Sequence, residues 1–93
     1  MPKFTTRVEL HNANGDDYDN LHDEMKAEGF TRTIKNSDGE SYRLPTAEYN
    51  YIGNNTASEV RDKAADAAGR VKKKFAVLVT ESASRSWQGL DKV

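Results

Sequence analysis

Two kinds of hydrophobic periodicity alternate along this chain, and their order limits the fold more than any other feature of the sequence. Strand-like stretches place inward-facing side chains at every second position, whereas helical stretches place them three and four residues apart. The first helical stretch follows Asp16 or Asp17, either of which is suited to cap it, and the second opens with the capping box Thr56–Glu59. Strand-like stretches cover residues 3–11, 30–35, 40–52 and 74–81. The order is therefore β-α-β-β-α-β, with a break or bulge expected at Pro45.

This order predicts an α+β fold. Its simplest closed form is the ferredoxin-like, or split β-α-β-β-α-β, sandwich, in which a four-stranded antiparallel sheet carries both helices on one face. The chain has 93 residues, of which 35% are hydrophobic, so we expect one domain with a thin core. The predicted ferredoxin-like domain covers residues 1–82, and residues 83–93 form a C-terminal surface tail that carries Trp87.

Tyr49 and Tyr51 lie two positions apart on the third predicted strand, so both rings point to the same face of the sheet. They either stack nucleic-acid bases on the open face or pack in the core beneath the helices. If the tyrosines faced outward, Glu48 and Asn50 would be buried, and burying an unpaired carboxylate and amide costs several kcal/mol. We therefore expect the tyrosines to point into the core.

The sheet face that the helices leave open carries apolar side chains. The predicted strands place Ile52, Ala76 and Leu78 on it, and an apolar sheet face is usually covered. The tail with Trp87 could fold over this face, or a second copy of the chain could pack against it, sheet on sheet. Both arrangements stay open at this point, so a homodimer is one of the expected partners.

The composition excludes several classes of protein. No cysteine is present, so the chain has no disulfide, no thiolate zinc site and no cysteine nucleophile. No apolar run approaches the roughly 20 residues of a membrane span, and the N-terminus shows no signal segment. We therefore expect a cytoplasmic protein with no membrane partner. Glycine-rich phosphate loops, nucleophile elbows and zinc-binding helix motifs are absent, and nothing indicates a metal or a small-molecule cofactor.

Charge is distributed unevenly along a chain whose net charge is −1. Residues 54–93 carry eight basic and five acidic side chains. The chain either presents this basic end to a phosphate backbone or has two helices with opposite charges on their solvent faces, and we favour the second interpretation. Asp16, Asp17 and Asp19 form an acidic cluster. Acidic side chains in the first turn stabilise the positive end of a helix. We interpret the cluster as such a helix end and not as a metal site.

Three stretches of the sequence are familiar together: "FTTRVELH", "YRLPTAEYNY" and "FAVLVTESASRSW". With the helical stretch "YDNLHDEM", they make most of the chain resemble small bacterial proteins of the GhoS-like family, the endoribonuclease antitoxins of type V toxin–antitoxin systems. The resemblance implies a ferredoxin-like fold and cleavage of the messenger RNA of a small membrane-damaging toxin. These stretches include no catalytic signature. Where the family carries an arginine after a leucine on the first helix, this chain has His22 after Leu21.

Two functions follow from these observations. As an enzyme, the chain would cleave single-stranded RNA, a reaction that needs a proton acceptor, a proton donor and positive charge near the phosphorus. The candidate catalytic residues are His22 and His11 as acid–base groups, with Arg7 and Arg32 stabilising the phosphate charge. As a non-catalytic protein, it would be a small dimeric binding module that uses the open sheet face or the basic C-terminal half.

Overall fold

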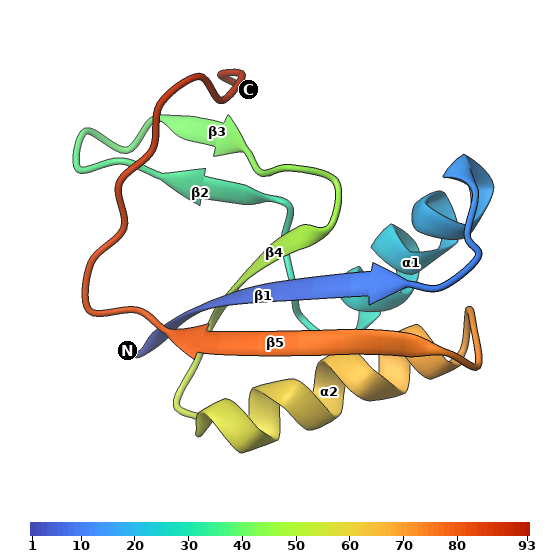
Figure 1. The fold of residues 1–93 in the computed structure, drawn as a ribbon. Coiled ribbons are helices and arrows are strands. Elements are labelled where there is room, and N and C mark those ends of the chain that lie inside the picture. Colours follow the sequence, from blue (N-terminus) through green and yellow to red (C-terminus); the bar gives the residue numbers. More distant parts are fainter.

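Five strands and two helices make up the fold in a computed structural model that describes residues 1–93 (Figure 1). The elements in chain order are β1 (Lys3–Leu10), α1 (Gly15–Ala27), β2 (Thr33–Lys35), β3 (Ser41–Arg43), β4 (Glu48–Ile52), α2 (Ala57–Gly69) and β5 (Phe75–Glu81). The predicted α+β class and both predicted helices are confirmed. Neither helix has the length and the apolar composition needed to cross a membrane.

The strands form two antiparallel sheets. Three of them pair in the order β4-β1-β5, while β2 and β3 form a separate hairpin. The structure thus has sheets of three and two strands where the sequence predicts one sheet of four. The division arises at Pro45, which has no N–H group to donate to a ladder. The stretch 40–52 breaks there into β3 and β4, which pair with different partners.

A backbone bridge links the hairpin to the larger sheet. The amide of Thr31 donates to the carbonyl of Asn50 over 2.9 Å, and the amide of Asn50 donates to the carbonyl of Thr31 over 2.8 Å. Because Thr31 lies just before β2, this bridge holds the start of the hairpin beside β4. It also fixes the position of the next residue, Arg32, relative to the sheet.

Each helix begins with a capping box. The N-cap of α1 is Asn14, whose side chain accepts from the Asp17 amide over 3.0 Å, while the Asp17 carboxylate accepts from the Asn14 amide over 3.1 Å. The N-cap is therefore Asn14 and not the predicted Asp16 or Asp17. Asp17 instead provides the second acceptor of the capping box, for the Asn14 amide. Thr56 and Glu59 form the predicted box of α2. Asp16 and Asp17 thus occupy the first turn of α1, as the helix-end interpretation requires.

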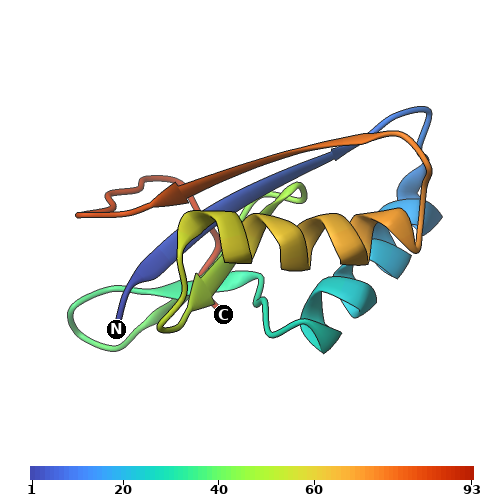
Figure 2. The ribbon, with the colours of Figure 1, turned by 90° about the horizontal axis from the view of Figure 1, so that it is seen from below.

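Both helices cover the same face of the three-stranded sheet (Figure 2). On α2, Ala64, Ala67 and Ala68 are fully buried, and their small side chains let the helix lie close to β1 and β5. From α1, Leu21 and Met25 complete the core. The core is therefore a single layer between the sheet and the two helices.

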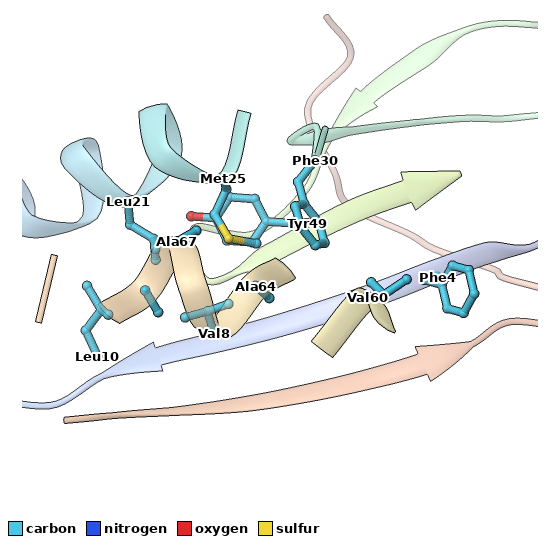
Figure 3. Close-up of a cluster of buried hydrophobic side chains, with 11 residues drawn as sticks. Phe4, Val8, Leu10, Leu21, Met25, Phe30, Tyr49, Val60, Ala64 and Ala67 are labelled. Carbon is cyan, nitrogen blue, oxygen red and sulfur yellow. The ribbon is translucent and has the colours of Figure 1, made fainter. Parts of the chain in front are cut away.

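Tyr49 and Tyr51 point toward the helices, as predicted. Tyr49 is fully buried in the same cluster as Met25 and Phe30 (Figure 3), with 6.4 Å between the ring centroids of Tyr49 and Phe30. Tyr51 is half-buried, and its ring centroid lies 6.2 Å from that of Phe4 and 5.0 Å from that of Phe30. The pair therefore belongs to the core and forms no stacking platform on the open face.

The opposite face of the sheet is only partly covered. Leu78 and Ile52 remain 64% and 50% exposed there. The tail runs from the end of β5 to the β2–β3 hairpin (Figure 1), where it forms backbone hydrogen bonds with β3. Its Trp87 packs against Tyr42 of β3, with 5.8 Å between the ring centroids. Trp87 is thus covered by the hairpin, and it does not cover Leu78 or Ile52.

The burial of Leu21 gives a matched test of this core. Leu21 is fully buried, whereas Leu78 on the outer face of the sheet is 64% exposed. We expect Leu21→Ala to lower the free energy of unfolding by about 2–5 kcal/mol. We expect Leu78→Ala to change it by less than about 0.5 kcal/mol. Urea denaturation followed by circular dichroism measures both values, and equal losses would contradict the assignment of the two faces.

Candidate functional site

A cavity of about 310 Å³ lies between α1 and the β2–β3 hairpin. Its lining comes from α1, from the segment that leads into β2, and from the end of β3. Most of the lining side chains are polar or charged: His22, Asp23, Lys26, Thr31, Arg32, Thr33 and Arg43. We call this space the His22 cavity.

The ring of His22 is held by the core. His22 follows the buried Leu21 on α1, so the packing of Leu21 places the imidazole at the edge of the core. There the Nδ1 atom of His22 lies 2.7 Å from the Oη atom of Tyr49. We assign the Tyr49 hydroxyl as the donor. Its O–H group has no other acceptor in the chain, and a buried O–H group needs one. The proton of neutral His22 is then on Nε2, at the opposite edge of the ring.

Burial and neighbouring cations favour the neutral form of His22. Desolvation lowers the pKa of His22 below its ordinary value of 6.5, and the positive charges of Arg32 and Arg43 lower it further. Two nearby aspartates act in the opposite direction, but the net shift of the pKa is downward. Burial also raises the pKa of Tyr49. The phenol therefore stays protonated and remains a hydrogen-bond donor to His22.

The His22 cavity has more positive than negative side chains. Lys26, Arg32 and Arg43 line it together with one carboxylate, that of Asp23, which leaves a formal surplus of two positive charges. None of the three cations forms an ion pair. The Nε atom of Arg32 is buried and has no hydrogen-bond partner. A buried donor without a partner costs free energy, and the surplus of positive charge along the lining attracts an anion.

This arrangement suits a phosphate group. Guanidinium groups donate parallel hydrogen bonds to phosphate oxygens, and the Nε2–H group of His22 adds a neutral donor. The structure has no group of three or more His, Asp or Glu side chains placed to hold a metal ion. The lining side chains themselves offer the chemistry of imidazole and guanidinium groups.

The four predicted catalytic residues do not come together. His22 and Arg32 both line the His22 cavity. Arg7 lies on the exposed outer face of β1, because alternation along the strand turns it to the face opposite the core. Its Nη2 atom lies 3.8 Å from the Oε2 atom of Glu9. His11 is exposed just beyond the end of β1. A site at the His22 cavity therefore includes neither Arg7 nor His11.

Three residues of this site were not among the predicted catalytic residues. Lys26 lies four residues after His22, about one turn along α1, so helical spacing could have identified it. Arg43 reaches the cavity because β3 pairs with β2, and no local pattern indicates that pairing. Tyr49 was correctly predicted in the core, but its hydroxyl also positions His22.

The lowered pKa of His22 makes the stability of the protein depend on pH. Below pH 6.5 the unfolded chain protonates His22 more readily than the folded chain, so this contribution to stability is lost as the pH falls. We expect His22→Gln to reduce the loss of stability between about pH 7 and pH 5. His11→Gln, which leaves His22 in place, should retain it. Urea denaturation at a series of pH values measures the effect.

NMR titration of the His22 ring gives the control for this prediction. In Tyr49→Phe, the Nδ1 atom of His22 loses the donor that favours its neutral form, so the pKa of His22 should rise toward its ordinary value. A pKa above 6.5 for His22 in the unmodified protein would contradict the arrangement described above.

Comparison with known proteins adds no relative to this picture. No protein-family model matches the sequence, and no curated protein matches it. The function is therefore inferred from the His22 cavity together with the resemblance described above.

Proposed function

We propose that the protein is a GhoS-like antitoxin endoribonuclease that cleaves single-stranded RNA at the His22 cavity. One observation carries this proposal. His22 and Arg32, which the sequence suggested independently as an acid–base group and a phosphate-binding group, line the same cavity and have two further cations beside them. The cavity therefore offers both the charge and the proton carrier that phosphodiester cleavage needs.

The phosphate backbone of RNA supplies the anion that this cavity lacks. Arg32 and Arg43 bind phosphate oxygens through their guanidinium groups, and Lys26 adds a third positive charge. A single strand is the favoured substrate, because its nucleotides are not held in a duplex and can enter a cavity of this size. The resemblance implies that this strand is the messenger of a small toxin, which places the activity in the cytoplasm.

Cleavage proceeds by attack of the ribose 2′-oxygen on the adjacent phosphorus. The O2′–P bond forms and the P–O5′ bond breaks, which gives a 2′,3′-cyclic phosphate and a free 5′-hydroxyl. The 2′-hydroxyl loses its proton to water, and the protonated form of His22, which becomes more populated as the pH falls toward its lowered pKa, donates its Nε2 proton to the departing O5′ atom. Arg32 stabilises the charge on the pentacoordinate phosphorus. In protonated His22 the Nδ1 atom also carries a hydrogen, so during this step Nδ1–H donates to the Tyr49 hydroxyl oxygen, and the imidazole stays in place.

We also propose that the fold belongs to the ferredoxin-like class. The Thr31–Asn50 bridge supports this proposal, because it sets the segment before β2 beside β4, at the edge of the β4-β1-β5 sheet. If that bridge were extended into a ladder, this segment would be the fourth strand of a single sheet. The position of both helices on one face also agrees with this class (Figure 2).

Substitutions inside and outside the His22 cavity test the proposed cleavage. We expect His22→Gln to lower the rate of cleavage of a single-stranded RNA pool by about 100-fold, the lower range of general acid catalysis. Arg32→Gln should lower it by about 100-fold as well, because it removes the positive charge at the phosphorus. Arg7→Gln and His11→Gln should leave the rate unchanged. Gel electrophoresis of end-labelled RNA measures all five proteins.

The pH profile of cleavage gives an independent readout. If protonated His22 is the acid, the rate falls as the pH rises above the pKa of His22, which lies below 6.5. His22→Gln should remove that part of the profile, and circular dichroism verifies that the variant is folded. Full activity in His22→Gln, or no cleavage by the unmodified chain at any pH, would contradict the proposal.

A non-catalytic dimeric module is the second candidate, and the outer face of the sheet favours it. Ile52 and Leu78 are 50% and 64% exposed there, where a second copy of the chain could pack sheet against sheet. In that case we expect the unmodified chain to elute with the mass of a dimer and Leu78→Glu with that of a monomer. Size-exclusion chromatography with light scattering measures both masses. A monomeric unmodified chain excludes this candidate.

A further inference from the structure

A second cavity, of about 550 Å³, lies between the C-terminal tail and the β2–β3 hairpin. Residues 82–87 form one wall, and Lys3, Lys35 and Tyr42 contribute from β1, β2 and β3. The volume falls within the roughly 300–1,000 Å³ that is usual for small-molecule sites. This space, which we call the tail cavity, shares no lining residue with the His22 cavity.

The tail cavity is lined by cations and by no carboxylate. Lys3, Lys35 and Arg85 border it, and none of the three forms an ion pair. Glu40, which accepts from the Asn36 side chain on the cavity wall, is already paired with Lys92 of the tail. Three positive charges thus border a space whose other polar side chains are all neutral. An anion is the ligand that such a lining selects.

Arg85 distinguishes this cavity from an ordinary basic surface. Its Nη1 atom donates to the Oδ1 atom of Asn50 over 2.7 Å and to the Oγ1 atom of Thr5 over 3.4 Å, on the outer face of the sheet. Both acceptors are neutral, and burial lowers the pKa of Arg85, so its charge is desolvated without a counter-ion. The Nε and Nη2 atoms have no partner in the chain. The guanidinium group is therefore held in place with donors left for an anion.

Two aromatic rings complete the lining. Trp87 from the tail and Tyr42 from β3 are both half-buried, with 5.8 Å between their centroids and 59° between their planes. Aromatic rings beside a cationic groove are the usual surface on which proteins stack the bases of a single strand. An inorganic anion makes no use of such a wall, whereas a nucleotide uses both the rings and the charges.

We propose that the tail cavity binds a nucleotide, with its phosphate on Arg85 and the two lysines and its base against Trp87. The nucleotide is either one unit of a single-stranded RNA or a free mononucleotide, since both present the same phosphate and base. This site does not depend on cleavage at the His22 cavity, because the two cavities share no residue.

The fluorescence of Trp87 reports directly on this site, because it is the only tryptophan of the chain. The full chain is titrated with inorganic phosphate, with AMP and with a short oligoadenylate. We expect AMP and the oligoadenylate to change the fluorescence, and phosphate at the same concentration to have little effect. Tighter binding of the oligoadenylate than of AMP identifies the strand as the ligand, and equal binding identifies the free nucleotide. No change with either nucleotide, or equal responses to phosphate and AMP, overturns the proposal.

Substitutions locate the binding. Arg85→Gln should weaken AMP binding by about tenfold, because it removes a charge-assisted contact, and Arg85→Lys should weaken it less. The matched control Arg61→Gln changes an arginine on α2 outside the cavity and should leave the affinity unchanged. For the oligoadenylate, Arg85→Gln should also reduce the slope of log affinity against log salt by about 0.7.

Two further variants keep this test decisive. An unchanged AMP affinity in Arg85→Gln overturns the proposal. If circular dichroism shows that this variant is unfolded, Lys35→Gln replaces it, because Lys35 is exposed at the end of β2, and weaker AMP binding is again expected. His22→Gln should leave the AMP affinity unchanged, so failure of RNA cleavage and failure of nucleotide binding at the tail cavity are measured separately.

Discussion

The hydrogen bond between Tyr49 and His22 connects the core of this protein to its candidate site. Tyr49 is fully buried, so its hydroxyl must find a partner inside the protein. His22 provides that partner, with 2.7 Å between Oη and Nδ1. The bond ties β4 to α1 and selects one orientation of the imidazole. Because the opposite nitrogen is then turned away from the phenol, the packing of the core determines which atom of His22 a ligand can reach.

Adjacent residues of β4 serve opposite faces of the sheet. Tyr49 points toward the helices, while the side chain of Asn50 accepts from Arg85 on the outer face. The backbone of Asn50 also forms the bridge to Thr31, which precedes Arg32. One short strand therefore positions residues of both cavities. A shift of its register by one residue would exchange the two faces and disrupt both cavities together.

Features that depend on local pattern could be predicted from the sequence, and features that depend on distant pairing could not. The inward tyrosines follow from the two-residue period of a strand, and the start of α2 follows from its capping box. Arg32 and Arg43 reach one cavity because Thr33 pairs with Arg43 in the hairpin, a relation that no local pattern contains. The place of Arg85 likewise depends on how the tail crosses the sheet. The position of Arg7, in contrast, could be predicted from local pattern. Arg7 alternates with the core residues of β1, so the sequence already places it on the face opposite the helices.

The net charge of −1 does not show which charged side chains form ion pairs and which do not. Asp17 completes the cap of α1 and contacts Lys72, while Glu24 and Glu28 both bind Arg70. These pairs use three carboxylates and two basic groups near the helices, and the cations of the two cavities have no carboxylate partner. A guanidinium group whose hydrogen-bond acceptors are neutral has no nearby negative charge to compensate it. It therefore attracts an incoming anion, whatever the total charge of the chain. The arrangement of the ion pairs therefore predicts an anionic ligand that the overall composition does not.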